Sequence, residues 1–225
     1  MSGRVPALTD LGPEAGGWVL ALHSSSETLG VALQPLNQPE IPPRMAAFPL
    51  GRGLASRLLP CVETLLPAPE WPRLARLAVA TGPGGFTGTR LTVAMARTLA
   101  QQLNLPLDGL SSFHLIARRL LAGAPSGRGL ILRQELPRHG VVAGLYRVEP
   151  TALAGVAELS PPRLWSSDTD LTRALGDHAH QTAQPRLPED ARELLAFSQA
   201  AARAGRDAPW ASVVPLYPTS PVAQG

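Results

Sequence analysis

Apolar runs bounded by polar turns divide the first part of the chain. Trp18–Leu22 and Leu29–Leu33 are continuous apolar segments joined by the polar stretch His23–Thr28, a pattern that predicts two buried strands in a hairpin. A short strand is predicted over Met45–Leu50, after a proline-rich stretch, and a further one over Leu77–Ala80. These strands form the first half of an alternating strand and helix pattern.

Helical spacing follows in two segments, Leu54–Leu66 and Leu91–Leu103. The first segment has two apolar stripes, one made of Leu54, Leu58 and Val62 and the other of Leu59 and Leu66. One stripe can cover a sheet and leave the other for a second subunit, or the helix can be sandwiched inside the protein. The second segment is rich in small residues, which permit close helix–helix approach.

The second part of the chain continues the pattern more weakly. Its predicted elements are a strand over Leu105–Leu110, a helix capped by Ser111-Ser112, strands over Leu130–Leu132 and Val141–Val148, a short helix after Ser167, and a helix from Pro188 to Gly205. The glycine-rich stretch Gly123–Gly129 is the predicted lobe boundary. We therefore expect an α/β protein with a loose extension over residues 1–17, a first lobe over 18–122 and a smaller, divergent second lobe over 123–225.

The segment TGPGGFTGTR, Thr81–Arg90, is the strongest candidate for a functional loop. It lies between a predicted strand and a predicted helix, where free N–H groups form an anion site and glycines allow close backbone approach. The segment lacks the Lys of a Walker loop, since the chain has no Lys, and its glycines are spaced too widely for a Rossmann fingerprint. Two interpretations stay open: tight packing of helix on sheet, or a nucleotide or phosphate loop formed by Gly82, Gly84, Gly85, Thr87, Gly88 and Arg90.

Composition excludes several classes of protein. The formal net charge is +3 and the arginines are scattered, so the charge pattern does not argue for direct nucleic-acid binding. A single cysteine, Cys61, excludes an intrachain disulfide and a cysteine metal cluster. His23, Ser24–Ser26 and the pair His178 and His180 lack the neighbours of a catalytic or metal site, so we predict neither. The absence of a long apolar run or a signal-peptide pattern predicts a cytoplasmic protein that is not bound to a membrane.

Three segments carry a resemblance to a known family. In order they are LALHSSSETLGVAL, RGLASRLLPCVETLL and ATGPGGFTGTRLTVAMARTLAQQLNLPLDGLSSFHLIA. Together they resemble the bacterial tRNA threonylcarbamoyladenosine biosynthesis protein TsaB family, also called YeaZ-like, over residues 18 to about 120. A fainter likeness is carried by Pro215–Tyr217. The resemblance implies an actin-like (ASKHA, ribonuclease H-like) fold of two lobes, with mixed sheets flanked by helices.

The resemblance also implies a function. Such proteins are non-catalytic partners of a TsaD-type subunit, and the complex transfers a threonylcarbamoyl group to an adenosine beside the anticodon of certain tRNAs. It leads us to expect ATP and a divalent metal in the partner and none bound by this chain alone, with a TsaE-type ATPase and tRNA as further partners and a homodimer open. By position, the expected partner interface consists of Leu54, Leu58, Val62, Val93, Ala96 and Ala100.

The chain departs from the family pattern at three positions. His23 stands where the family carries Asp at the end of the first strand, and imidazole is a poor ligand for Mg²⁺. Leu54 replaces a usual His, and only Gln134 or Glu135 lies near an Asp expected in the second lobe. These changes disfavour the alternative hypothesis, an independent actin-like ATPase or small-molecule phosphotransferase. A peptidase has no nucleophile or metal cluster to support it, and a self-associating scaffold stays compatible.

Overall fold

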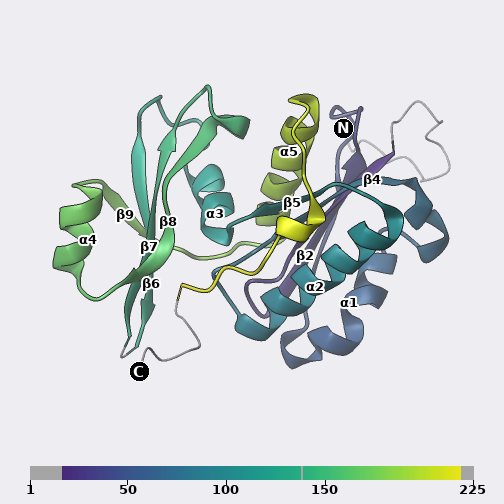
Figure 1. The fold of residues 1–225 in the computed structure, drawn as a ribbon, viewed down its shortest axis with the longest axis horizontal. Helices are drawn as coiled ribbons and strands as arrows, with labels where there is room; N and C mark the ends of the chain where they lie inside the picture. Colours follow the sequence, from purple (N-terminus) through teal and green to yellow (C-terminus); the bar gives the residue numbers. More distant parts are fainter. Residues whose placement is uncertain (1–16, 138, 219–225) are drawn as a thin grey trace, which may run out of the picture.

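The computed structural model describes residues 17–137 and 139–218. Two sheets lie side by side, each flanked by helices, and the chain returns to the first sheet after completing the second (Figure 1). The predicted loose extension over residues 1–17 lies, except for Gly17, outside the described residues. The predicted boundary near residue 122 falls between β5, the last strand of the first sheet, and β6, the first strand of the second.

The first sheet has five strands in the order β3-β2-β1-β4-β5. Their bounds are β1 Trp18–His23, β2 Thr28–Pro35, β3 Arg44–Pro49, β4 Leu74–Ala80 and β5 Leu107–Leu110. β1 pairs with β2 antiparallel and with β4 parallel, so the sheet is mixed. Every residue of β1 is buried, because helices cover both faces at the centre of the sheet, whereas the edge strand β3 is only half-buried.

Helices α1 (Leu54–Glu63) and α2 (Phe86–Leu103) lie side by side on one face of this sheet (Figure 1). Helices α3 (Ser112–Leu120) and α5 (Glu189–Arg203) lie on the other. α2 begins five residues before the predicted Leu91, because the end of the glycine-rich segment is itself helical. Ser111 caps α3 as predicted, its hydroxyl accepting a hydrogen bond from the His114 N–H at 3.1 Å.

The position of α5 corrects the predicted division of the chain. The sequence predicts that all of residues 123–225 belong to the second lobe, but α5 packs on the first sheet. Its Ala191, Leu194 and Leu195 are buried against small residues of β1, β2 and β4. A sheet face lined with alanines lets a helix approach closely, and helical periodicity alone does not tell which sheet the helix will cover.

The second sheet has four strands in the order β8-β7-β6-β9. Its elements are β6 Gly129–Leu136, β7 Gly140–Val148, β8 Val156–Trp165 and β9 Ala179–Thr182, with α4 Asp168–Leu175 on the face opposite α3. The 3-10 turns are η3 Gly51–Gly53, η4 Ala68–Arg73, η5 Leu153–Gly155 and η6 Trp210–Ser212. The sequence reading missed β8 and β9, because β8 carries Pro161-Pro162 with a shifted register and β9 is short and polar.

A buried ion pair links three elements of the first lobe. Arg76 on β4 donates two hydrogen bonds to the carboxylate of Asp108 on β5, at 2.7 and 2.9 Å. The hydroxyl of Ser198 on α5 donates to the same carboxylate at 2.6 Å. All three residues are buried, so each charge depends on the other for compensation. The pair fixes α5 and the chain that follows it against the edge of the sheet.

We predict that Arg76→Met lowers the free energy of unfolding by about 3–5 kcal/mol, because it leaves Asp108 as an uncompensated buried charge. Guanidinium unfolding followed by circular dichroism measures this. The matched control is Glu70→Gln, which breaks the partly exposed Arg73–Glu70 pair and should cost no more than about 1 kcal/mol. Equal effects of the two substitutions would contradict the structural role of the buried pair.

Candidate functional site

The glycine-rich loop leads from β4 into α2 and lies against the turn between β1 and β2. The Gly85 N–H donates to the Ser25 carbonyl at 2.7 Å. A Cβ on Gly84 would lie 2.2 Å from that same carbonyl oxygen, and a Cβ on Gly88 would lie 3.0 Å from the carbonyl oxygen of Ser24. These two glycines therefore allow the loop and the turn to touch. Tight packing accounts for them, and the phosphate interpretation stays a prediction.

Gly82 has a different reason to be glycine. Its φ is +95°, a backbone conformation that L side chains rarely adopt. In this conformation its carbonyl accepts a hydrogen bond from the Ser112 N–H at 2.7 Å. The loop is thus attached to the start of α3 as well as to the turn after β1.

The polar turn after β1 is built inward. His23 is fully buried, and the Ser25 hydroxyl lies 3.3 Å from its Nδ1. The Ser24 hydroxyl lies 2.6 Å from the Thr92 hydroxyl on α2 and 3.0 Å from the Gly88 carbonyl. Burial lowers the pKa of His23 to about 3, so its imidazole is neutral at physiological pH. These side chains join the turn to α2 and are not presented to solvent.

Two hollows adjoin the loop. The larger, about 470 Å³, lies where α1 and α2 begin and is lined by Gly85, Thr87, Gly88, Arg52 and Glu27 among others. The smaller, about 140 Å³, lies between the loop and the second sheet, where Gly84 faces Gln134 and Tyr217. Four of the six candidate phosphate-loop residues are therefore divided between two hollows, and Gly82 and Arg90 line neither. Among the described residues, no group of three or more His, Cys, Asp or Glu side chains is placed to hold a metal ion.

The structure corrects the predicted partner interface, because its six residues face inward. Leu54, Leu58, Val62, Val93, Ala96 and Ala100 are all buried in the core between the helices and the first sheet. They anchor α1 and α2, so a partner would contact the opposite faces of these helices. The outward faces carry Leu59, which is 45% exposed, Ala94, and the half-buried Leu91 and Met95. Of the second predicted stripe, only Leu59 faces outward, because Leu66 lies beyond the end of α1 and is fully buried in the core.

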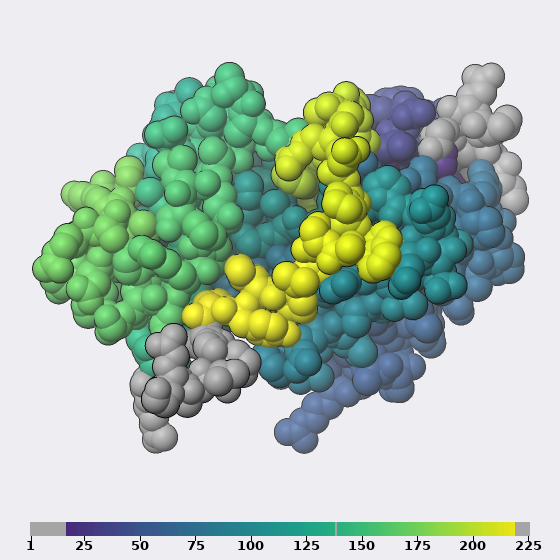
Figure 2. Space-filling model, viewed as in Figure 1, coloured from purple at the N-terminus to yellow at the C-terminus, as the bar shows by residue number. Residues whose placement is uncertain are grey.

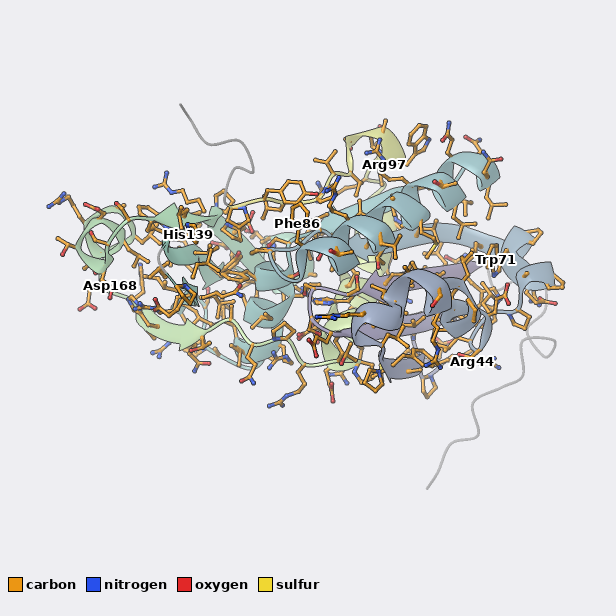
Figure 3. The ribbon with its side chains drawn as sticks, turned by 90° about the horizontal axis from the view of Figure 1, so that it is seen from below. Arg44, Trp71, Phe86, Arg97, His139 and Asp168 are labelled. Atoms are coloured by element: carbon orange, nitrogen blue, oxygen red, sulfur yellow. The ribbon has the colours of Figure 1, made fainter. Side chains whose placement is uncertain are left out.

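Sequence reasoning also missed an aromatic cluster at the start of α2. Phe86 is 51% exposed and its ring centroid lies 5.2 Å from that of Tyr217. The guanidinium of Arg90 lies over the Phe86 ring, 5.0 Å from its centroid. Phe86 belongs to the glycine-rich segment and Tyr217 to the faint Pro215–Tyr217 motif. The sequence therefore singled out both segments, but nothing in it indicated that they are in contact. Figure 3 labels Phe86 and Arg97, which both lie on α2.

Sequence comparisons match this chain to proteins of one tRNA-modification pathway. The family model described as TsaD, tRNA N6-adenosine threonylcarbamoyltransferase, matches residues 43–128. The tRNA threonylcarbamoyladenosine biosynthesis protein TsaB of Bacillus subtilis (strain 168) is 35% identical over 134 residues. The resemblance to the TsaB (YeaZ-like) family is confirmed. The match covers 57% of this chain and 55% of that relative, so the chain spans about half the length of the curated TsaB protein that it matches.

Solved structures agree on the fold. YeaZ from Pseudomonas aeruginosa superposes with a TM-score of 0.67 at 20% identity, covering 89% of this chain and 99% of that chain. A second Pseudomonas aeruginosa structure, described as similar to the peptidase YEAZ, gives a TM-score of 0.68 at 20% identity, covering 90% and 100%. The actin-like fold of two lobes, with mixed sheets flanked by helices, is confirmed. In the part of the chain that the structure describes, no helix is long and apolar enough to cross a bilayer.

We predict that Gly84→Ala destabilises the protein by about 1–3 kcal/mol, because the new methyl group would overlap the Ser25 carbonyl. Gly85→Ala is the matched control, since its Cβ would have no neighbour closer than 3.8 Å. Thermal and guanidinium unfolding of both variants measure the difference. Equal stability of the two would contradict the packing explanation of Gly84.

Acid should destabilise the protein through its buried histidines. Burial lowers the pKa of His23 to about 3 and that of His114 to about 4, below the unfolded value of 6.5. Below pH 6.5 the unfolded chain takes up protons that the native chain does not, so the free energy of unfolding decreases as the pH is lowered. Each histidine contributes a slope of at most about 1.4 kcal/mol per pH unit between pH 6.5 and its native pKa.

The measurement is the free energy of unfolding at several pH values from 7.5 to 5. His23→Asn should give a shallower pH slope than the unmodified protein, whereas His180→Asn, on the exposed strand β9, should leave it unchanged. Burial raises the pKa of Glu158 and of Asp190, and these groups offset part of the slope in both variants alike. An unchanged slope in His23→Asn would show that the imidazole is not the buried group that resists protonation.

Proposed function

We propose that the chain is a non-catalytic subunit in the biosynthesis of tRNA N6-threonylcarbamoyladenosine, which binds and activates a TsaD-type catalytic subunit. The observation that carries the proposal is the outward face of α1 and α2, which exposes apolar side chains on two helices that the core anchors. Both helices lie within residues 43–128, which match the TsaD family model. A role in this pathway is supported by the likeness to TsaB, and the binding of a TsaD-type partner is the further step.

The geometry suits helix-on-helix docking. α1 and α2 lie side by side, and their inward faces hold them to the sheet through a core that includes Leu58, Val62 and Val93 (Figure 1). Two helices fixed in this way present grooves into which helices of a partner can pack. A four-helix contact would then hold the catalytic lobe of the partner in its competent state. The chain would act through packing and not through chemistry.

The chemistry at the loop is consistent with a subunit that does not catalyse. A buried and neutral His23 stands where a carboxylate would be needed to hold Mg²⁺, and the serines beside it hydrogen-bond to α2 and to the imidazole. We propose that ATP and a divalent metal are bound by the partner, that tRNA and a TsaE-type ATPase join through the complex, and that the assembly works in the cytoplasm. A homodimer through the same helices would compete with it.

One observation favours a second candidate, an independent ATPase or phosphotransferase. The first N–H groups of α2 border the 470 Å³ hollow that also contains Arg52, and this is a setting that attracts anions. Glu27 lines the same hollow and opposes a phosphate there. ATP hydrolysis by the purified chain alone, lost in Gly85→Val, would favour this candidate over the partner role.

The partner role predicts a stable complex that depends on the outward helix faces. The purified chain is mixed with the TsaD homologue of the same organism, and the eluting species is measured by light scattering with and without ATP. Leu59→Gln and Ala94→Gln keep helix propensity and neutral charge, and each should weaken the complex at least about tenfold, the effect of losing a central apolar contact.

The matched control is Leu159→Gln, which alters a similarly exposed leucine on β8 of the second sheet. It should bind the TsaD homologue normally. A chain that forms no complex under either condition would overturn the proposed function, whereas normal binding by both helix variants would overturn only the assignment of the interface to α1 and α2.

A further inference from the structure

The net positive charge of the chain is concentrated on the two outward helices. η3, α1 and α2 together contain Arg52, Arg57, Arg90 and Arg97, and one acidic residue, Glu63. This surface therefore carries a net charge as large as the +3 of the whole chain. The helix α2 has no acidic residue along its 18 positions. Among the described residues, no ion pair is formed by these four arginines, whereas eight other arginines each have a carboxylate within ion-pair distance.

Two of these arginines are held on aromatic rings. Arg90 lies over Phe86, and Arg97 lies over Trp210, 5.9 Å from its centroid. Their positions differ by seven residues, close to two helical turns, so both project from the same side of α2. A guanidinium that stacks on a ring keeps its N–H edge free, and this edge can bind a carboxylate through two hydrogen bonds. The cation–π contacts thus favour one position for each of two cations that lack a counter-charge.

The C-terminal segment after α5 supplies one ring of each cluster. It runs between the two lobes across one face of the molecule (Figure 2, yellow). The Leu107 N–H on β5 donates to the Ala208 carbonyl, and the Leu216 N–H donates to the Thr81 carbonyl, both at 2.8 Å. Between and beyond these two anchors, Trp210 reaches Arg97 and Tyr217 reaches Phe86. Backbone pairing therefore positions Trp210 beside Arg97 and Tyr217 beside Phe86, the ring over which Arg90 lies.

We propose that Arg90 and Arg97, with the apolar residues between them, form a docking surface for an acidic helical face of a protein partner. The inference rests on the proposed function and deepens it: the TsaD-type partner would present carboxylates about two helical turns apart, along one side of an apolar strip. The apolar strip packs against Leu91, Ala94 and Met95, and the carboxylates bind the two ordered guanidinium groups. Such charge pairing at the edge of an apolar contact sets partner choice and speeds association.

The same surface is poorly suited to RNA. A nucleic-acid backbone needs a row of cations that neutralises successive phosphates, but the side of α2 next to Arg90 and Arg97 carries the apolar Leu91, Ala94 and Met95, which would remain uncovered. A protein face that alternates carboxylates with aliphatic side chains satisfies both the charge and the apolar strip.

The test compares the double variants Arg90→Glu/Arg97→Glu and Arg90→Gln/Arg97→Gln with the control Arg128→Glu, an exposed arginine in the turn before β6. The dissociation constant for the TsaD homologue is measured at 50 and 500 mM NaCl by biolayer interferometry. We expect the Glu variant to bind about 30- to 100-fold more weakly than the unmodified chain at 50 mM salt, and the Gln variant about tenfold more weakly. At 500 mM salt the ratio of each variant's dissociation constant to that of the unmodified chain should be smaller. The control should match the unmodified chain, and melting temperatures confirm that every variant folds.

The outcomes separate this inference from the proposed function. Folded variants that bind like the unmodified chain at both salt concentrations would overturn the acidic docking face and leave the partner role standing. Variants that keep the complex but lose affinity for unmodified tRNA, measured with the chain alone, would assign the arginines to RNA and overturn the inference as well. An unmodified chain that forms no complex at either salt concentration would overturn both.

Discussion

The hydrogen bond between the Gly85 N–H and the Ser25 carbonyl fixes the arrangement on which the proposed docking surface depends. It joins the turn after β1 to the first residue before α2, and the absence of a side chain at Gly84 allows the approach. The Ser24 hydroxyl continues the contact along α2 to Thr92. The contact fixes where α2 begins, and the buried Val93, Ala96 and Ala100 then set which residues of the helix face outward.

The two lobes are held together mainly through α3 and α5. Phe113 of α3 is buried in the core of the second sheet, while Leu115 of the same helix is buried against the first. On its last turn, Arg118 pairs with Glu193 at 3.0 Å and Arg119 pairs with Asp190 at 2.6 Å, both partners being on α5. α3 therefore belongs to both cores. This dual packing explains why α5 lies on the first sheet although it follows the second in the chain.

Hydrophobic spacing predicted most elements of the first lobe because their apolar runs are long and sharply bounded, as in Trp18–Leu22. It failed where a segment owes its structure to neighbours. β9 has no apolar residue that faces a core, and α5 could have covered either sheet. The candidate site shows the same division. The glycine loop was recognisable from composition, whereas the outward position of Leu59 on α1 and the Phe86–Tyr217 contact depend on which distant residues meet.

The C-terminal segment has a consequence for the timing of assembly. Trp210 and Tyr217 reach α2 from residues that the ribosome adds more than a hundred positions after Phe86. Until then α2 can fold on its sheet, but Tyr217 has not yet joined Phe86 beneath Arg90, and Trp210 has not yet reached Arg97. The Leu107 N–H at the edge of β5 also has no Ala208 carbonyl to bind. The surface offered to a partner during translation therefore differs from the finished one, and a partner that reads the ordered arginines would distinguish a completed chain from a nascent one.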